Sequence, residues 1–294
     1  MHRACEMFKT ILVPASGSRT DEAVFATALG LARSFDAHLR FLHVRLTPAT
    51  AALAVSQFAF CRGAAISHEL ERLRGLMDEL ATSARRHVED FCKTNGVGFR
   101  DTPSPAGMVT ASWLEELDQP TERFLFHARH NDLVVLGRRA SRDHLPTGLL
   151  EDILVEGGRP IVIAHDPPPR GYGTIAVGWK ETPEAARALA AALPLLRQAT
   201  NVFLLGIAEK QAASRDAFED LARQLTWHGI DARVTMASET TRPAAPELLQ
   251  VAADLKADLL VLGGFGHTRS RELVFGGVTH AVINDAALPV FLMH

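Results

Sequence analysis

The chain has 294 residues, of which 47% are hydrophobic and 22% charged, a length and composition typical of two globular domains. A net charge of −3 without a basic stripe argues against nucleic-acid binding, and no run of about 18 apolar residues is present to span a membrane. Cys5, Cys61 and Cys92 lack C-x-x-C spacing, so we expect free thiols rather than disulfides or zinc ligands. Because no signal peptide is recognisable, we expect a cytoplasmic protein.

In the first half of the chain, short apolar runs alternate with helical patterns. The predicted elements are, in order, a strand over 9–14, a helix over 22–35, a strand over 38–44, a long charged helix over 68–93, a third strand after 95–97, a strand over 131–137 and a strand over 159–165. Short apolar runs between helical patterns are typical of parallel strands that are buried on both faces of a sheet.

Residues 47–67 form an insertion between the second strand and the long helix, and the second half has no counterpart to it. Two interpretations of this segment are open. It is either a helix that covers the sheet or the partner domain, or a mobile lid or interaction surface. Small apolar residues over 48–60 favour the first interpretation, because Ala-rich amphipathic pieces are common packing material.

The second half repeats the order of elements of the first. Three consecutive prolines in Asp166-Pro167-Pro168-Pro169-Arg170 predict a stiff linker between the halves. Beyond it we predict a strand over 173–178, a helix over 183–198 with Thr182 as N-cap and Pro183 in its first turn, a strand over 201–207, a third strand after 228–230, a strand over 257–263, a helix from 277 to about 285 and a strand over 288–294. The repeat predicts two doubly wound α/β domains, at residues 1–166 and 171–294.

The segment GGFGHTRSRELVFGG at 263–277 directly follows the fourth strand of the second half. Ligands of open α/β sheets bind at the carboxyl ends of the strands, and a helix N-terminus there offers unpaired N–H groups and a positive dipole end to an anion. Glycine lets a phosphate approach the backbone closely because it has no Cβ. The segment therefore favours a phosphate-binding loop, although tight turns without a ligand also use glycine.

The strand-Gly-x-x-Gly-x9-Gly-x pattern, with Ile-Leu-Val-Pro at 11–14 and Pro289-Val290 near the end, resembles the universal stress protein family in its tandem form. The resemblance covers essentially the whole chain. It implies two five-stranded parallel sheets of the adenine nucleotide alpha hydrolase-like fold with strand order 3-2-1-4-5. It also implies that the fifth strands of the two halves pair, so that the chain forms an intramolecular pseudo-dimer.

In the nucleotide-binding branch of that family, this motif wraps the ribose and phosphates of ATP. The resemblance therefore implies a site in the second half for an adenine nucleotide, namely ATP, with Mg²⁺ as its counter-ion. The residues that match the motif or lie beside it are Leu262, Gly263, Gly266, His267, Gly276, Gly277 and Val278, together with Lys180 after the first strand of that half.

Both halves depart from the family pattern. Gly277 replaces the usual Ser or Thr, and Lys180 replaces an Asp that contacts the nucleoside. A lysine cannot accept a hydrogen bond, although it meets a phosphate as a point charge; a solvated lysine at a strand end is the alternative interpretation. In the first half Ala140 and Leu150 replace motif glycines, so we expect no ATP site of this kind there.

Three functions stay open on the sequence alone. The first is a stress-response module regulated by ATP binding in the second half, and the second is an interaction or scaffold protein of the same fold that binds no nucleotide. The third is an enzyme, but neither G-x-S-x-G nor H-E-x-x-H is present, so no catalytic residue or metal ligand is predicted. An adenine nucleotide and an unidentified protein are the expected partners, and association of two chains stays open.

Overall fold

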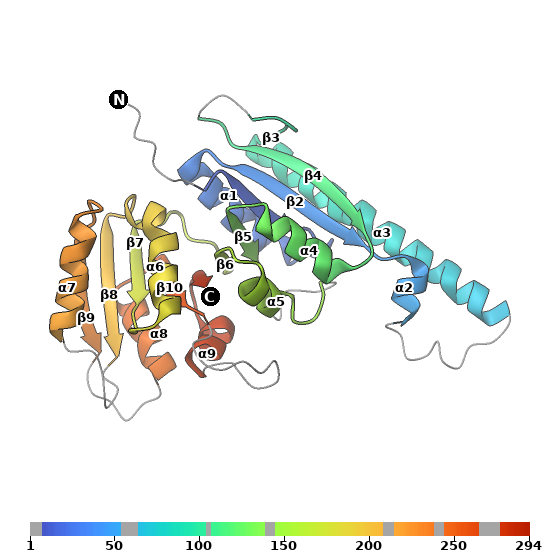
Figure 1. Ribbon diagram of the computed structural model, residues 1–294. Helices are drawn as coiled ribbons and strands as arrows, with labels where there is room; N and C mark the ends of the chain where they lie inside the picture. The colour runs from blue at the N-terminus through green and yellow to red at the C-terminus, as the bar shows by residue number, and fades with distance from the viewer. Residues whose placement is uncertain are drawn as a thin grey trace.

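The computed structural model describes residues 8–53, 64–103, 107–138, 145–207, 215–237, 244–264 and 277–294 (Figure 1). Within these ranges the first half alternates strands and helices, as the sequence predicts. Its elements are β1 Thr10–Pro14, α1 Asp21–Phe35, β2 His38–Arg45, α2 Pro48–Leu53, α3 Ala64–Asn95, β3 Gly98–Phe99, β4 Thr110–Leu117, α4 Pro120–Arg129, β5 Leu133–Leu136, α5 Leu149–Glu156 and β6 Ile161–Ile163.

The second half has the same alternation. Its elements are β7 Thr174–Gly178, α6 Pro183–Leu196, β8 Asn201–Ile207, α7 Arg215–Thr226, β9 Ala232–Ala237, α8 Ala244–Asp254, β10 Leu259–Gly263, α9 Gly277–Asp285 and β11 Val290–Met293. Residues 164–173, which include the predicted linker, form neither helix nor strand. The domain limits 1–166 and 171–294 stay a prediction.

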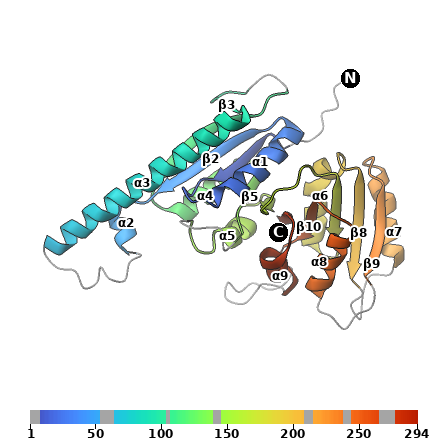
Figure 2. The ribbon, with the colours of Figure 1, turned by 180° about the vertical axis from the view of Figure 1, so that it is seen from behind.

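The described strands form one mixed sheet that runs through both halves (Figures 1 and 2). Their order is β3-β4-β2-β1-β5-β6-β11-β10-β7-β8-β9. Neighbouring strands are parallel within each half, whereas β6 and β11 pair antiparallel, with Val162 opposite Phe291. The predicted α/β fold class is therefore confirmed, and the last strands of the two halves, β6 and β11, join them into a single sheet. The described part of the first half has six strands instead of the predicted five, because two strands, β3 and β4, follow α3.

Helices cover both faces of the sheet because successive strand side chains point to opposite sides. Ile11 and Val13 pack into a layer with α1, α3, α6 and α7, while Leu12 packs into the opposite layer with α4, α5, α8 and α9. The same alternation continues through Leu260, Val261 and Leu262 in β10. Burial of each such side chain contributes about 1.5–3 kcal/mol, which explains why these strands read as unbroken apolar runs.

The prediction of the third strand in the first half was wrong in its position. The segment directly after Val97 forms only the two-residue β3, and the strand that pairs with β2 is β4. The sequence signal for β4 is weak because Glu115 and Glu116 interrupt its apolar residues. Charged side chains of this kind are common on strands near the edge of a sheet, where one face meets water.

Helix α3 is longer than predicted, and its N-terminal turns extend beyond the carboxyl ends of β2 and β4 (Figure 1). The insertion was expected to cover the sheet or the partner domain, but α2 packs mainly against α3, with Ala51 and Leu73 buried together. Residues 54–63 of this insertion lie outside the described residues. No helix in the described ranges combines the length and apolar character needed to cross a bilayer.

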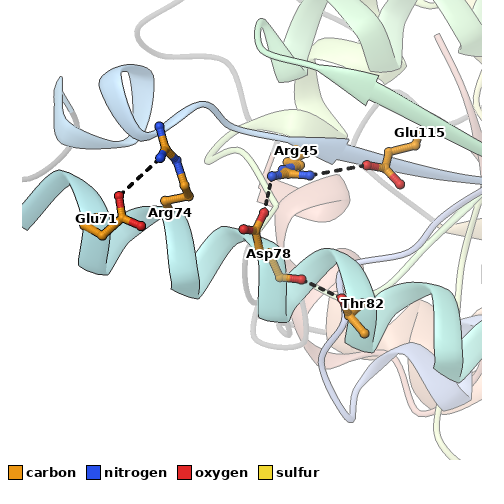
Figure 3. Close-up of polar contacts among 6 residues, drawn as sticks. All are labelled: Arg45, Glu71, Arg74, Asp78, Thr82 and Glu115. Atoms are coloured by element: carbon orange, nitrogen blue, oxygen red, sulfur yellow. Dashed lines mark hydrogen bonds and ion pairs between the residues drawn. The ribbon is translucent and has the colours of Figure 1, made fainter.

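The side chain of Arg45 connects helix α3 to the sheet (Figure 3). Arg45, at the end of β2, contacts Asp78 of α3 and lies 4.0 Å from the carboxylate of Glu115 in β4. These side chains are between a third and a half exposed, so each ion pair contributes less than about 1 kcal/mol. The contacts orient α3 more than they stabilise it.

Candidate functional site

The carboxyl ends of β7, β10 and β11 meet at one edge of the second half, where the sequence predicts a ligand site. The backbone N–H of Gly264, just after β10, donates to the carbonyl of Met293 at 2.8 Å. The imidazole Nδ1 of His294 lies 3.0 Å from the carbonyl oxygen of Gly264. The chain is therefore held at the point where the glycine-rich segment begins.

The first predicted site residues, Leu262 and Gly263, are tightly packed. Leu262 is 6% exposed. Its Cδ2 atom lies so close to Gly178 of β7 that a Cβ on Gly178 would come within 2.3 Å of it. A Cβ on Gly263 would lie 2.5 Å from the backbone nitrogen of Ala185 in α6. Gly263 is thus required by the close approach of β10 to α6, whether or not a nucleotide binds.

The next glycine has a packing role on the other side of the sheet. A Cβ on Gly264 would lie 2.9 Å from Cδ2 of Leu154, which belongs to α5 of the first half. Gly263 therefore faces the layer of α6 and Gly264 the layer of α5, as strand alternation requires. The second contact joins the candidate site to the first half of the chain.

The loop after β7 leads directly into α6. The predicted N-cap is confirmed: the Thr182 hydroxyl accepts from the backbone N–H of Ala185 at 3.3 Å, and Pro183 occupies the first turn. Lys180 lies in this loop and is exposed. Its position at the carboxyl end of β7 agrees with the sequence prediction, and its role in binding stays a prediction.

Sequence reasoning missed Glu184, which lies in the first turn of α6 beside the carboxyl end of β10. Its side chain is 15% exposed and pairs with Arg187 at 3.0 Å. Burial raises the pKa of Glu184, but hydrogen bonds from its own backbone N–H and from Thr182, with the charges of Arg187 and His294, lower that pKa further, below its usual range. The candidate site therefore contains an ionised carboxylate at neutral pH. The Thr-Pro-Glu sequence was the available signal.

Helix α9 begins at Gly277, and no acidic residue lies in its first turn. Because α9 connects the parallel strands β10 and β11, its N-terminus lies at the carboxyl edge of the sheet. Val278 is partly buried, and its side chain packs against the apolar layer beneath. Gly266, His267 and Gly276 lie outside the described residues.

The loop after β1 in the first half corresponds to the loop after β7, and it is closed by its own side chains. Asp21, at the start of α1, accepts hydrogen bonds from the Ser16 hydroxyl at 2.6 Å and from the backbone N–H groups of Ser16 and Gly17 at 3.2 and 2.9 Å. Burial raises the pKa of Asp21 although these hydrogen bonds oppose the shift. The N–H groups that point into this loop are therefore already partnered.

Helix α5 occupies the place in the first half that α9 has in the second. It starts after Gly148, and Leu150 is fully buried in the apolar layer. Glu151 and Asp152 stand in its first turn. Two carboxylates at a helix N-terminus stabilise the helix but repel a phosphate. That the first half has no ATP site stays a prediction.

Arg138 follows β5 at the position equivalent to Gly264, and sequence reasoning assigned it no role. Its guanidinium donates to the carbonyls of Ile283 and Leu288 in the second half, at 2.9 and 2.8 Å. Burial lowers the pKa of Arg138, and the charge of Asp285 opposes that shift. The first-half segment thus contacts α9 of the other half.

Two cavities in the described part of the chain lie elsewhere. One, of about 460 Å³, is lined by Cys92, Phe99 and Trp113 below the C-terminal part of α3, and the other, of about 320 Å³, lies between Arg45 and Met77. Neither is at the strand ends of the second half. Among the described residues, no cluster of His, Cys, Asp and Glu has the arrangement of a metal site.

Comparison with known proteins agrees with the geometry. The family model described as the universal stress protein family matches residues 7–94 and 171–294. A universal stress protein from Archaeoglobus fulgidus has a similar structure, with a TM-score of 0.70, 15% identity and coverage of 97% of each chain. A functionally unknown protein from Pseudomonas aeruginosa PAO1 has a TM-score of 0.53, 12% identity and coverage of 97% of this chain and 92% of the other.

At these identities the two structures show a shared fold. A comparison with curated proteins gave no match. The assignment rests on the family model, which matches the chain twice, once in each half, and on the repeated order of elements in the structure. This chain belongs to the universal stress protein family, in its tandem form.

Proposed function

We propose that the protein binds an adenine nucleotide, ATP with Mg²⁺, at the carboxyl edge of the second half. The observation that carries the proposal is the position of the two ends of the glycine-rich segment 263–277. Its first residues, Gly263 and Gly264, stand at the carboxyl end of β10, and its last residue, Gly277, begins α9. Family membership adds the chemistry, because the spacing of the motif glycines matches that of the nucleotide-binding branch, although Gly277 stands in place of the usual Ser or Thr.

The electrostatics of the described residues fit a phosphate chain. The first turn of α9 carries no acidic side chain, so no carboxylate within that turn opposes its N–H groups and positive dipole end. Lys180 adds a cation at the end of β7. Glu184 places a carboxylate at the same edge, and Mg²⁺ bound to the phosphates would lessen the repulsion between the two.

The proposal assigns roles to the residues named from the sequence. The backbones of Leu262, Gly263 and Gly266 would contact the ribose, and those of Gly276, Gly277 and Val278 the phosphates. Lys180 and His267 would add positive charge, although a lysine cannot replace the hydrogen-bond acceptor usual at the nucleoside. Binding there would report the energy state of the cell to a protein partner.

Isothermal titration of the purified full-length chain with Mg-ATP tests this function. We expect binding to the wild-type protein and none to Gly276→Glu, because the new carboxylate would stand beside the phosphates. The thermal unfolding temperature of Gly276→Glu should stay close to that of the wild type. No heat of binding to the wild type at millimolar nucleotide would contradict the proposal.

A second candidate function is an interaction module that binds no nucleotide. The observation that favours it is that packing against the backbone of α6 by itself explains Gly263. The working surface would then be the insertion, where α2 packs on the projecting part of α3. Deleting residues 47–67 should abolish capture of a protein partner by this candidate, whereas ATP binding in the second half should survive the deletion under the first proposal.

A further inference from the structure

Arg138 is placed by the fold to act on the other half of the chain. It follows β5, where Val134 and Leu136 point to the layer of helices α4, α5, α8 and α9. The next residue in that alternation is Arg138, so its side chain enters the same layer. There it crosses the β6–β11 junction and meets α9.

The contacts of Arg138 are those of a helix cap. One guanidinium nitrogen donates to the carbonyl of Ile283 in the last turn of α9 at 2.9 Å. The other donates to the carbonyl of Leu288, between α9 and β11, at 2.8 Å. A helix C-terminus has unpaired carbonyls and a negative dipole end, so a cation that donates two hydrogen bonds stabilises it.

Helix α9 depends on such outside contacts. It has only nine residues, GVTHAVIND, and carries no basic residue in its own last turn. Glycine, β-branched residues, Asn and Asp all have poor helix propensity, and a helix this short is unstable without tertiary packing. Arg138 provides from the first half the positive charge that α9 lacks.

The first half also touches the segment on the other side of the motif. Leu154 of α5 packs where a Cβ on Gly264 would otherwise lie. Helices α5 and α9 lie side by side in both views of the molecule (Figures 1 and 2). Residues of the first half therefore contact the chain immediately before the glycine-rich motif and the helix immediately after it.

We propose that Arg138 is a positioning residue for the nucleotide site of the second half: by holding the C-terminal end of α9, it sets the helix N-terminus where the phosphates bind. This inference rests on the proposed function. The first half, which has lost the glycine motif, thereby supports binding in the half that retains it. The ligand class is an adenine nucleoside polyphosphate, bound through its phosphates.

The test compares two arginine variants of the full-length protein. Arg138→Met removes the hydrogen bond to Ile283 at the end of α9 and the one to Leu288 just beyond it, whereas Arg129→Met is a matched control. Arg129 donates to the carbonyl of Glu156, at 3.0 and 3.1 Å, and so caps the end of α5 within the first half. Both variants lose an arginine cap, but only one of the caps is on α9.

Titration with Mg-ATP and amide hydrogen exchange of peptides over 277–289 are measured for each protein. We expect Arg138→Met to weaken Mg-ATP affinity about tenfold and to speed exchange in α9 about tenfold. Arg129→Met should leave both within about twofold of the wild type, even if it lowers the unfolding temperature as much. Arg138→Lys keeps the charge but has a single donor nitrogen, so it should give an intermediate affinity. It replaces Arg138→Met in the test if that variant does not fold.

The outcomes separate this inference from the function on which it rests. Wild-type binding with unchanged affinity in Arg138→Met overturns the inference and leaves the proposed function standing. Equal loss of affinity in the two variants also overturns it, because the effect would then follow stability alone. Absence of Mg-ATP binding to the wild type overturns both the proposed function and the predicted effect of Arg138 on affinity. If amide hydrogen exchange in α9 is also unchanged in Arg138→Met, the inference that Arg138 stabilises this helix is overturned as well.

Discussion

Each half of the molecule carries a carboxylate in the first turn of its first helix, and the two have opposite surroundings. Asp21 is 5% exposed and accepts three hydrogen bonds from the loop after β1. Glu184 lies at the edge of the candidate site and pairs with Arg187. The comparison teaches that the first half has used its carboxylate to close the strand-end loop, whereas the second half keeps charge at this edge.

The helices that follow β5 and β10 differ in the same sense. Helix α5 begins with acidic residues that oppose an anion, while the first turn of α9 has none. At equivalent positions, Arg138 of the first half reaches across to α9 and Gly264 of the second half accommodates Leu154. The first half thus contributes contacts that hold the fold together, whereas the second half keeps a helix N-terminus without acidic residues in its first turn.

The largest expected effect concerns Gly263, and it tests whether the glycines of the second half serve packing. Gly263→Ala should lower the free energy of unfolding by about 3 kcal/mol, because its Cβ would meet backbone atoms of α6 that cannot move freely. Urea denaturation measures the change. A Cβ on Gly171 would meet nothing within 4 Å, so Gly171→Ala should be neutral or raise stability by up to about 1 kcal/mol.

Should Gly263→Ala unfold as the wild type does, the packing explanation for this glycine would be wrong. Titration of the same variant with Mg-ATP separates the two roles, because a purely structural glycine leaves affinity unchanged once the protein is folded.

The second prediction sets the two carboxylates against each other. Asp21→Ala should cost about 2–3 kcal/mol of stability, because it leaves the buried Ser16 hydroxyl and two backbone N–H groups without their acceptor. Glu184→Ala should cost about 0.5–1 kcal/mol, the usual contribution of an ion pair and a charge in the first helical turn. Chemical denaturation at neutral pH measures both, and equal costs would contradict the proposed contrast.

The smallest expected effect is the pH dependence of the same two residues. The folded-state pKa of Asp21 is raised above 3.8, chiefly by burial, so its contribution to stability is present at low pH and is lost as pH rises through that pKa. The folded-state pKa of Glu184 lies below 4.5 despite its burial, so its contribution is present above 4.5 and is lost as pH falls through the folded-state value.

Denaturation of the wild type, Asp21→Asn and Glu184→Gln between about pH 3 and 7 measures these contributions as differences. The stability of the wild type relative to Asp21→Asn should fall as pH rises. The stability of the wild type relative to Glu184→Gln should instead increase as pH rises through the lower part of the same range. Parallel curves for the two variants would show that the carboxylates lie in similar environments.

Much of the architecture was predictable from local patterns. Apolar runs such as Ile11–Val13 and Leu259–Leu262 predict buried parallel strands, since only a strand covered on both faces is apolar at every position. The cap formed by Thr182 and Pro183 was also readable, because its hydrogen bond joins residues three apart in sequence. Strand β4 was missed, since its glutamates lie near the sheet edge and obscure the alternation.

The site was less predictable, because its contacts join residues that are distant in sequence. The glycines indicated where the chain needs room, but a sequence does not state whether a ligand, α6 or Leu154 fills the space. The role of Glu184 depends on the approach of α6 to the end of β10, and that of Arg138 on the pairing of β6 with β11.

The class of elements, their order, their repetition and the place of the glycine-rich motif could be read from local patterns, because hydrophobic periodicity and turn chemistry act over a few residues. Only the tertiary structure decided that Gly263 and Gly264 face different helices and that Arg138 caps a helix 145 residues away. The physical reason is that packing and capping depend on which surfaces meet once the two halves share a sheet, and that pairing is a property of the whole fold.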